Sequence, residues 1–310
     1  MRALITGITG FAGGYLANHL KLLGYEVFGT TSKSINKTSR ISLVNQWTTE
    51  KEIIDLLNEI QPDYVYHLAG LSNVKESWDD KISVVSTNTN LTIKLLEAAR
   101  KSSVSNHVKI LTVGSSEEYG RVADPTVPIN EGDALQPMNP YGVSKAAVSY
   151  LAKQYFTAYG LKVIHARSFN HIGPGQRLGF VVSDFASQIV QIEHKQQEKI
   201  LRVGNLDAKR DFTDVRDIVR AYHLLLESDA CGEIFNVCSG KPISISDLIQ
   251  KLLELSTVEI ELQLDQSRMR PNDIPFYIGN NNKLKELTGW RPQIAVETTL
   301  LDVLEYLRNI

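Results

Sequence analysis

A tyrosine and a lysine stand four residues apart at the start of a predicted helix. Tyr141 and Lys145 enclose the segment Tyr-Gly-Val-Ser-Lys, directly after Pro140. Residues four apart on a helix share one face and lie one turn from each other. A nearby ammonium group favours the phenolate and lowers the pKa of a tyrosine toward the working range. Tyr141 is therefore predicted to exchange a proton with a carbonyl or hydroxyl group, although the same spacing also occurs on ordinary surface helices.

A serine follows the predicted strand at residues 109–113. Residues just beyond the carboxyl ends of the strands in a doubly wound sheet face the ligand crevice. Ser115 stands at such a position, two residues after the strand. We therefore expect its hydroxyl to hydrogen-bond the reacting oxygen.

A glycine-rich turn near the amino terminus predicts a site for a pyrophosphate. Gly7, Gly10 and Gly13 lie between the first apolar run and the first helical pattern, with the spacing GxxGxxG. The first glycine permits the tight turn, and the second lets backbone N–H groups approach the pyrophosphate. The third allows close packing of helix and sheet. In this position the pattern indicates a dinucleotide cofactor.

The end of the second predicted strand bears on which cofactor is used. A site for NAD usually has an acid there, because a carboxylate accepts a hydrogen bond from the ribose 2′-hydroxyl. This chain has Thr31, Ser32 and Lys33 instead. Hydroxyl groups beside a lysine tolerate a 2′-phosphate, so NADP(H) is favoured and NAD(H) stays possible. A solvated polar loop with no role in binding is nearly as consistent with these residues.

Short apolar runs alternate with longer helical patterns over the first two-thirds of the chain. Strands are predicted at residues 3–6, 26–30, 64–68, 109–113 and 162–167, with a weak one at 41–44, and helices at 11–23, 50–60, 84–100 and 141–159. Nearly continuous apolar strands suit a parallel sheet that is buried on both faces. We therefore predict an α/β fold with a doubly wound (Rossmann) parallel sheet and a smaller C-terminal mixed α/β region.

The predicted domain boundary follows the change of pattern after the last of these strands. Residues 1–167 are expected to form the dinucleotide-binding domain, to which a later segment at about 205–238 also contributes. Residues 168–310 are expected to form mainly the substrate-binding region. This division begins at a loop rich in Gly, Asn and Pro.

Composition excludes several classes of protein. The 310 residues are 43% hydrophobic and 22% charged, with a formal net charge of −2. Such a chain is neither disordered nor collagenous, and it has no global field to attract nucleic acid or an anionic membrane. We see no secretory pattern and no apolar run of bilayer length. Cys231 and Cys238 fit neither a disulfide framework nor a metal site, so we expect a cytoplasmic enzyme without a metal.

Together these motifs resemble the extended short-chain dehydrogenase/reductases that act on nucleotide sugars. The resemblance spans essentially the whole chain and includes the segment His67-Leu68-Ala69-Gly70. It implies a catalytic triad of Ser115, Tyr141 and Lys145, a C-terminal region that binds a nucleoside diphosphate sugar, and a homodimer formed through a four-helix bundle from residues 84–100 and 141–159. The cofactor-binding residues that it implies are Gly7, Thr9, Gly10, Phe11, Ala12, Gly13, Thr31, Ser32, Lys33, Leu68, Ala69, Gly70, Tyr141, Lys145 and His171.

Finer features resemble the GDP-mannose 4,6-dehydratase branch of this family. Residues 204–211 and 268–271 carry the resemblance, and in the wider family the arginines that match Arg210 and Arg270 contact the diphosphate. The fixed fork of guanidinium donors suits that contact. Within the branch, residues 169–176 and 179–184 resemble the GDP-4-keto-6-deoxy-mannose reductases. The implied substrate-binding residues are Ser115, Glu117, Tyr141, Asn170, Val182, Lys209, Arg210 and Arg270.

This resemblance implies a specific reaction. The C4 keto group of GDP-4-keto-6-deoxy-D-mannose would be reduced to give GDP-D-rhamnose, a precursor for surface polysaccharide. Hydride would come from NAD(P)H and the proton from Tyr141, while Ser115 orients the carbonyl. Lys145 would tune the tyrosine and hold the nicotinamide ribose.

One acidic residue leaves alternatives open. Glu117 matches the glutamate that dehydratases use as the base at sugar C5, a task that a reductase lacks. It could be inherited from a dehydratase-like ancestor, could accept a hydrogen bond from a substrate hydroxyl, or could support dehydratase activity. The alternative functions are therefore GDP-mannose 4,6-dehydratase, a lyase, or another nucleotide-sugar epimerase or reductase. A protein that binds NADP without turnover is disfavoured, because the Tyr/Lys pair is intact.

Overall fold

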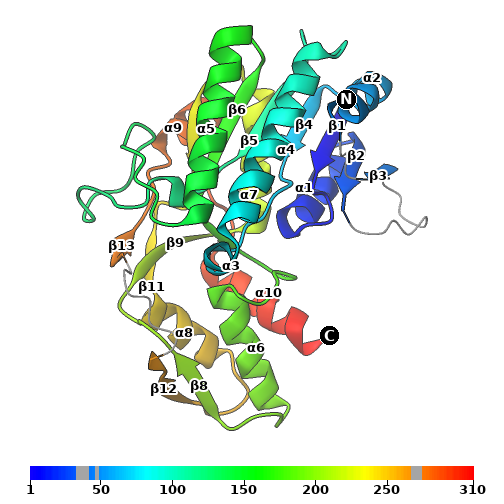
Figure 1. Cartoon of the computed structure of the whole chain (residues 1–310). Helices are drawn as coiled ribbons and strands as arrows, with labels where there is room; N and C mark the ends of the chain where they lie inside the picture. Colours follow the sequence, from blue (N-terminus) through cyan, green and yellow to red (C-terminus); the bar gives the residue numbers. More distant parts are fainter. Residues whose placement is uncertain (33–41, 46–48, 267–273) are drawn as a thin grey trace.

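Seven parallel strands form the central sheet of the molecule (Figure 1). The computed structural model describes residues 1–32, 42–45, 49–266 and 274–310. In spatial order the strands are β10 (Ile234–Val237), β6 (Val163–Ser168), β5 (Lys109–Val113), β4 (Tyr64–His67), β1 (Arg2–Thr6), β2 (Glu26–Thr31) and β3 (Ser42–Asn45). The chain winds outward from β1 in both directions, which confirms the predicted doubly wound parallel sheet. A crevice for ligands is expected where the order reverses, at the carboxyl ends of β1 and β4.

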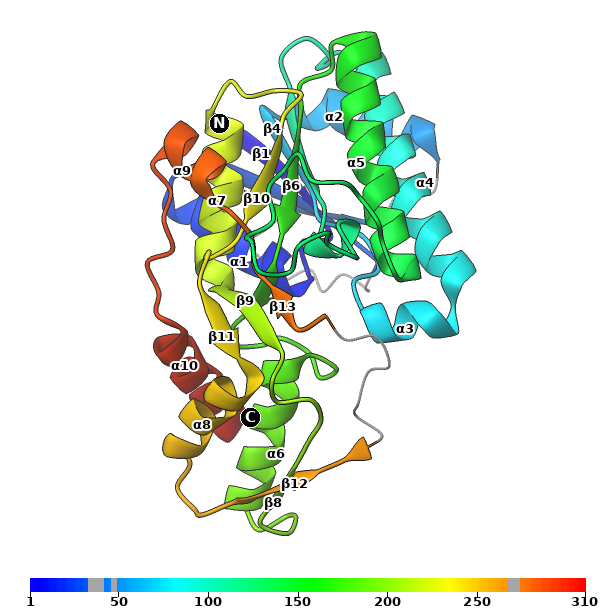
Figure 2. The same ribbon diagram turned by 90° about the vertical axis from the view of Figure 1, so that its left-hand side faces the viewer.

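Helices cover both faces of this sheet, as Figure 2 shows from the side. On one face lie α1 (Phe11–Leu22) and α7 (Val215–Glu227), and on the other lie α2 (Glu50–Ile60), α4 (Lys81–Lys101) and α5 (Pro140–Tyr159). Because both faces are covered, β4 and β6 are buried along their whole length. The short helix α3 (Val74–Asp79), which the sequence patterns do not predict, precedes α4.

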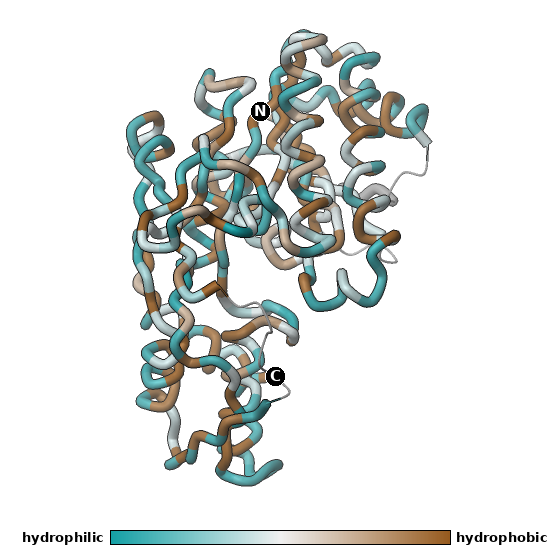
Figure 3. Tube along the Cα trace, turned by 60° about the vertical axis from the view of Figure 1, so that its left-hand side comes forward, coloured by the Kyte–Doolittle hydropathy of each residue, from teal (hydrophilic) through white to brown (hydrophobic). Residues whose placement is uncertain are grey.

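The rest of the chain builds a second part at the carboxyl edge of the sheet (Figure 1). Its four-stranded sheet contains β7 (Asn170–Ile172), β9 (Lys209–Asp214), β11 (Pro242–Ser244) and β13 (Phe276–Tyr277), and β8 (Ile200–Val203) pairs with β12 (Glu261–Leu264). Three helices, α6 (Val181–Glu193), α8 (Ile245–Glu254) and α10 (Val296–Arg308), share one apolar core with these strands. Hydrophobic and hydrophilic segments alternate along the helices of both parts (Figure 3), as expected for helices with one buried face.

The chain passes more than once between the two parts. After β9 it returns to the large sheet as α7 and β10, and after β13 it returns again as α9 (Asn282–Thr288), which packs near β10. Trp290 follows α9 and lies in the same core as α1 and α7. No described helix is both long and apolar enough to cross a membrane.

Trp290 provides a test of how strongly the C-terminal segment stabilises the large sheet. Its ring is 1% exposed, and its Nε1–H donates to the Asp217 backbone oxygen at 3.0 Å. Trp290→Ala should lower the free energy of unfolding by about 3–5 kcal/mol, because it leaves a cavity in the core. Urea unfolding followed by circular dichroism measures this change. Trp78→Ala is the control, since Trp78 is 51% exposed. Equal decreases in the free energy of unfolding for the two variants would contradict the stabilising role of the buried Trp290 ring.

Candidate active site

The glycine-rich turn joins β1 to α1 and touches the end of β4. Gly7 has a φ of +71°, and a Cβ there would lie 2.9 Å from the Cα of Ala69. A Cβ on Gly13 would lie 2.4 Å from the Gly7 carbonyl oxygen. Gly10 caps α1 without any side-chain hydrogen bond, so no side chain covers the first N–H groups of the helix. Such a cradle fits a pyrophosphate, because backbone donors and the helix dipole both favour an anion.

A buried hydrogen-bond chain fixes the segment after β4 against this turn. The Ala69 N–H donates to Thr6 Oγ1 at 3.1 Å, and Thr6 Oγ1 lies 2.8 Å from His67 Nδ1. On its other side, His67 Nε2 lies 3.1 Å from Thr92 Oγ1. Burial, aided by the charge of Lys145, lowers the pKa of His67 to about 3. The imidazole is therefore neutral, and Leu68, Ala69 and Gly70 are held beside the glycine turn.

The end of β2 lies next to the same turn. The hydroxyl groups of Thr9 and Thr31 are 2.8 Å apart, and Thr31 is buried while Ser32 is exposed. Of the three residues on which the prediction of NADP(H) rests, Lys33 lies outside the described residues. Thr9, Thr31 and Ser32 are thus close to the expected cofactor site.

Ser115, Tyr141 and Lys145 come together at the carboxyl ends of β4, β5 and β6. Each of them is 8% exposed. The Lys145 ammonium donates to the Val113 backbone oxygen at 2.7 Å and lies 5.8 Å from the centre of the Tyr141 ring. The Ser115 hydroxyl is near enough to the Tyr141 phenol to act on its pKa. The three groups that the sequence predicts to react together therefore form one cluster.

Burial controls the proton affinities of this cluster. It raises the pKa of Tyr141; the Ser115 hydroxyl lowers that pKa by less than burial raises it, and the charges of Glu117 and Glu118 each add a smaller increase. Burial also lowers the pKa of Lys145 to about 8, while the charge of Glu118 works in the opposite direction. The sequence-based prediction that the Tyr141 pKa is lowered is therefore wrong for this structure, because desolvation outweighs every effect that favours the phenolate.

A second, fully buried carboxylate holds the loop that carries Ser115. Glu118 Oε1 accepts hydrogen bonds from the Ser115 N–H at 2.8 Å and from His165 Nε2 at 3.0 Å. Its Oε2 accepts from Arg167 Nε at 2.7 Å. Burial alone would raise the pKa of Glu118, but His165 and Arg167 lower it below its ordinary value. The sequence analysis missed this residue, since nothing in the order of residues shows that three polar groups meet inside the fold.

Asn139 connects Glu117 to the helix that carries Tyr141. Its Oδ1 accepts from the Gly142 N–H at 2.7 Å, which caps the first turn of α5. Its Nδ2 donates to Glu117 Oε2, also at 2.7 Å. An asparagine directly before a proline at the start of a helix is a recognisable capping signal, so the sequence could have indicated the cap but not the contact with Glu117.

His171 lies over the start of α1. Its ring is stacked on that of Phe11, with the ring centres 6.0 Å apart and the planes 4° from parallel. Nδ1 lies 3.1 Å from the Phe169 backbone oxygen, and burial lowers the pKa of the imidazole. Nearby, the Tyr15 hydroxyl donates to the Pro174 oxygen at 2.9 Å. The loop that follows β6 is thereby fastened beside the glycine turn.

The predicted substrate residues of the second part are more dispersed. Lys209 and Arg210 begin β9, Asn170 is exposed at the start of β7, and Arg270 lies outside the described residues. Arg210 Nη1 donates to the Ile274 oxygen at 2.6 Å. The side chain of Val182 is 1% exposed within the core of the second part, which leaves it no open face for a ligand.

Asp211, another residue that the sequence analysis missed, fixes the position of β9. Its buried carboxylate accepts from the N–H groups of Ser239 at 2.8 Å, Gly240 at 2.9 Å and Gly279 at 3.3 Å. Burial raises its pKa to about 6 despite these bonds. The strand that carries Lys209 and Arg210 is thus anchored to the segments that follow β10 and β13.

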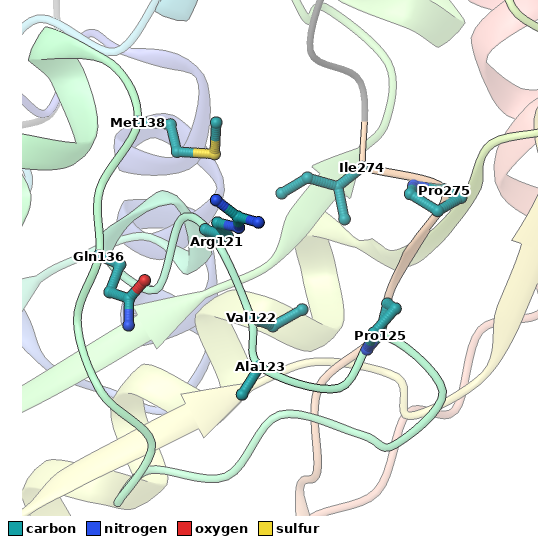
Figure 4. Close-up of a pocket in the computed structure, with 8 residues that line it drawn as sticks. All are labelled: Arg121, Val122, Ala123, Pro125, Gln136, Met138, Ile274 and Pro275. Atoms are coloured by element: carbon teal, nitrogen blue, oxygen red, sulfur yellow. The ribbon is translucent and has the colours of Figure 1, made fainter.

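The structure has a cavity of about 690 Å³, which Figure 4 shows with its lining side chains. It is lined by Arg121, Val122, Ala123, Pro125, Gln136, Met138, Ile274 and Pro275. Met138 directly precedes Asn139 in the chain, while the Pro275 oxygen accepts from the Lys209 N–H at 2.8 Å. Two lining residues, Met138 and Pro275, are therefore directly linked to Asn139 and to the start of β9. In the described parts of the chain, no group of three or more His, Cys, Asp or Glu side chains could hold a metal ion.

Comparisons with known proteins agree with this arrangement. The family model described as GDP-mannose 4,6 dehydratase matches residues 4–303. GDP-6-deoxy-D-mannose reductase of Pseudomonas aeruginosa is 35% identical, over 98% of this chain and 96% of the relative. GDP-mannose 4,6 dehydratase of Homo sapiens is 28% identical, over 97% of this chain and 90% of the relative.

Solved structures show the same architecture. RMD from Pseudomonas aeruginosa complexed with NADPH has a TM-score of 0.84 and 33% identity, and the match covers 99% of both chains. UDP-glucose 4-epimerase from Thermotoga maritima with UDP-glucose has a TM-score of 0.86 and 26% identity, covering 100% of this chain and 99% of the other. Since the family model matches almost the entire length, the chain belongs to the GDP-mannose 4,6 dehydratase family.

Proposed function

We propose that this protein is an NADPH-dependent reductase that acts on a nucleotide sugar. Its substrate would be GDP-4-keto-6-deoxy-D-mannose, and reduction of the C4 keto group would give GDP-D-rhamnose. The observation that carries the proposal is the buried cluster of Ser115, Tyr141 and Lys145, in which the tyrosine is held in its protonated form. A reductase needs that form, because it must give a proton to the oxygen of the reduced carbonyl.

The cofactor proposed for this site is NADPH, with NADH as a weaker alternative. Glycines at positions 7, 10 and 13 leave room for a pyrophosphate, since a Cβ at two of them would clash with backbone atoms. Thr9, Thr31 and Ser32 would face the 2′-phosphate of the adenosine, and His171 would help to enclose the nicotinamide end. When bound, NADPH supplies the hydride. The NADPH complex of the Pseudomonas aeruginosa structure supports this choice.

Each member of the cluster has a separate task in the proposed mechanism. Ser115 donates a hydrogen bond to the C4 oxygen and orients the carbonyl beside the phenol. Tyr141 then transfers its proton to that oxygen as negative charge develops there. Lys145 is fixed by its bond to the Val113 oxygen, so its remaining protons can point toward the tyrosine and the nicotinamide ribose. Burial strengthens these interactions, because little water competes with the fixed donors.

Binding of the substrate would involve both parts of the molecule. We assign the diphosphate to Lys209, Arg210 and Arg270, and the sugar to the region of Ser115, Glu117 and Tyr141. The cavity described above has a largely apolar wall, which includes Met138, next to Asn139 in the chain, and Pro275, which is bonded to Lys209. Residues 168–310 would thus supply most of the nucleotide-sugar site, and a cytoplasmic location follows from the proposed substrate and cofactor, which are metabolites of that compartment.

A second candidate function is the dehydratase reaction of the same family. It is favoured by Glu117, a carboxylate near Tyr141 that could remove a proton from sugar C5. One oxygen of this carboxylate is already bound by the Asn139 amide at 2.7 Å. The reductase is preferred, because the identity to GDP-6-deoxy-D-mannose reductase is 35%, against 28% to the human dehydratase.

The two functions differ in the consumption of cofactor. Purified protein should oxidise one NADPH for each GDP-4-keto-6-deoxy-D-mannose consumed, as measured by the loss of absorbance at 340 nm. No reaction is expected with GDP-mannose alone. A 4-keto product from GDP-mannose without net oxidation of NADPH would refute the reductase and support the lyase.

Substitution of Tyr141 tests the proton transfer. Tyr141→Phe removes the hydroxyl and keeps the ring, so kcat should fall by about 10²–10⁴-fold while the Kd for NADPH changes little. Tyr159→Phe is the matched control, because Tyr159 lies on the same helix and is 51% exposed. A Tyr141→Phe variant with wild-type kcat would exclude this mechanism.

We further propose a homodimer formed through a four-helix bundle of α4 and α5. These helices pack closely against each other and leave apolar side chains exposed, including Ile82 at 83% and Tyr150 at 66%. Sedimentation equilibrium should give twice the chain mass for the wild type and a large monomer fraction for Tyr150→Glu. Leu287→Glu, on α9 and 44% exposed in the wild type, should remain dimeric. A monomeric wild type would contradict the proposal.

A further inference from the structure

A single side chain binds the two segments that carry the predicted reactive groups. Asn139 is 8% exposed and uses both ends of its amide. The oxygen must face the Gly142 N–H and the nitrogen must face the Glu117 carboxylate, so both partners agree on one orientation of the amide. The first turn of α5 and the carboxylate of Glu117 are therefore fixed to the same group.

Glu117 is restrained at its backbone as well. Its N–H donates to Ser115 Oγ at 3.2 Å, within the short 3₁₀ turn of residues Ser116–Glu118. A Cβ on Gly142 would lie only 2.4 Å from the Glu117 carbonyl oxygen, so this turn and α5 are in close contact. The side chain of Glu117 can therefore change direction only by breaking its bond to Asn139.

The charge of Glu117 lies close to the reacting phenol. It contributes to the raised pKa of Tyr141, after burial and against the lowering by the Ser115 hydroxyl, and it also raises the pKa of Tyr277. Only Oε2 of the carboxylate is bound by Asn139. A carboxylate that is aimed in this way beside the site of the sugar is suited to accept a hydrogen bond from a hydroxyl group.

We propose that Asn139 is a positioning residue for the substrate, which aims the Glu117 carboxylate at a sugar hydroxyl next to the keto group. The inference depends on the proposed function only in placing a sugar beside Tyr141. Asn139 thereby makes Glu117 a fixed acceptor rather than a free base. The same amide caps α5, so the tyrosine and the acceptor keep a constant separation.

The test is the affinity for the keto sugar, which does not require turnover. Calorimetry with GDP-4-keto-6-deoxy-D-mannose and NADP⁺ measures a complex in which no hydride is available for reduction. Asn139→Ser keeps a good helix cap, but its shorter side chain ends in a single oxygen at the capping position and lacks the amide nitrogen that reaches Glu117. We expect the Kd of the keto sugar to rise about tenfold, the equivalent of one hydrogen bond of about 1.4 kcal/mol, while the Kd of NADP⁺ stays unchanged.

Asn139→Asp should make the affinity for the keto sugar depend on pH, which would not happen if Asn139 only capped α5. The aspartate still caps α5, but its second oxygen would lie next to the Glu117 carboxylate. Two such carboxylates share one proton and lose it only at raised pH. We expect affinity near that of the wild type at about pH 5 and a progressive loss as the pH rises toward 8. The wild type should show no such loss, because its amide carries no titrating proton.

A double-mutant cycle distinguishes an effect of Asn139 on the position of Glu117 from a general effect on the stability of the fold. In the background Glu117→Ala, the change Asn139→Ser should have no further effect on the Kd, because the group that it orients is gone. Asn58→Ser is a control, since Asn58 makes similar bonds to Ser103 from α2, remote from the site. An unchanged Kd in both Asn139 variants, or the same tenfold loss with and without Glu117, would overturn the proposal. If the protein shows no reductase activity, this binding test can still be carried out, because it measures affinity without turnover.

Discussion

The buried charge of Glu118 is the constraint on which the arrangement of the catalytic end depends. A carboxylate without solvent contact is costly unless its oxygens are paired, and here its partners come from a strand and from a separate loop. Arg167 and His165 approach from β6, and the Ser115 N–H approaches from the loop after β5. Arg167 also donates to Ser149 on α5 at 3.1 Å. Glu118 thus connects the sheet to the loop that carries Ser115 and, through Arg167, to the helix that carries Tyr141. These connections fix the positions of Ser115 and Tyr141 relative to each other.

The same charge affects the proton balance of the cluster. Burial disfavours ionisation of both Tyr141 and Lys145, so an isolated cluster would hold a neutral phenol beside a weakened cation. The negative charge of Glu118 supports the protonated form of Lys145 and opposes the phenolate of Tyr141. Both effects keep protons in the site. This state suits a reaction that ends with the transfer of a proton to the product. It indicates that Tyr141 donates a proton rather than accepts one, which the spacing of the Tyr/Lys pair alone does not show.

The sequence predicted those features that depend on local pattern. Alternating apolar runs and helices predicted the doubly wound sheet, and even the weak strand near residue 41 forms as β3, from Ser42 to Asn45. The glycine turn and the pair Tyr141/Lys145 depend on short spacings, and each has the local arrangement that its spacing predicts. Features that depend on distant partners were missed. Glu118 meets His165 and Arg167 across more than forty residues, with separations of 47 and 49. The raised pKa of Tyr141 was also missed, because burial is a property of the whole fold.

Reductases, dehydratases and epimerases share this architecture, so the fold cannot decide between their reactions. Their common cluster of Ser, Tyr and Lys moves a proton at one oxygen of the sugar. A dehydratase also needs a base that is free to take a proton from carbon. In this chain the carboxylate nearest the phenol is held by an amide that also caps the catalytic helix. That contact engages only Oε2 of Glu117 and fixes the direction of the other oxygen. The choice between the two reactions therefore depends on whether this second oxygen meets a hydroxyl group or a C–H group of the bound sugar.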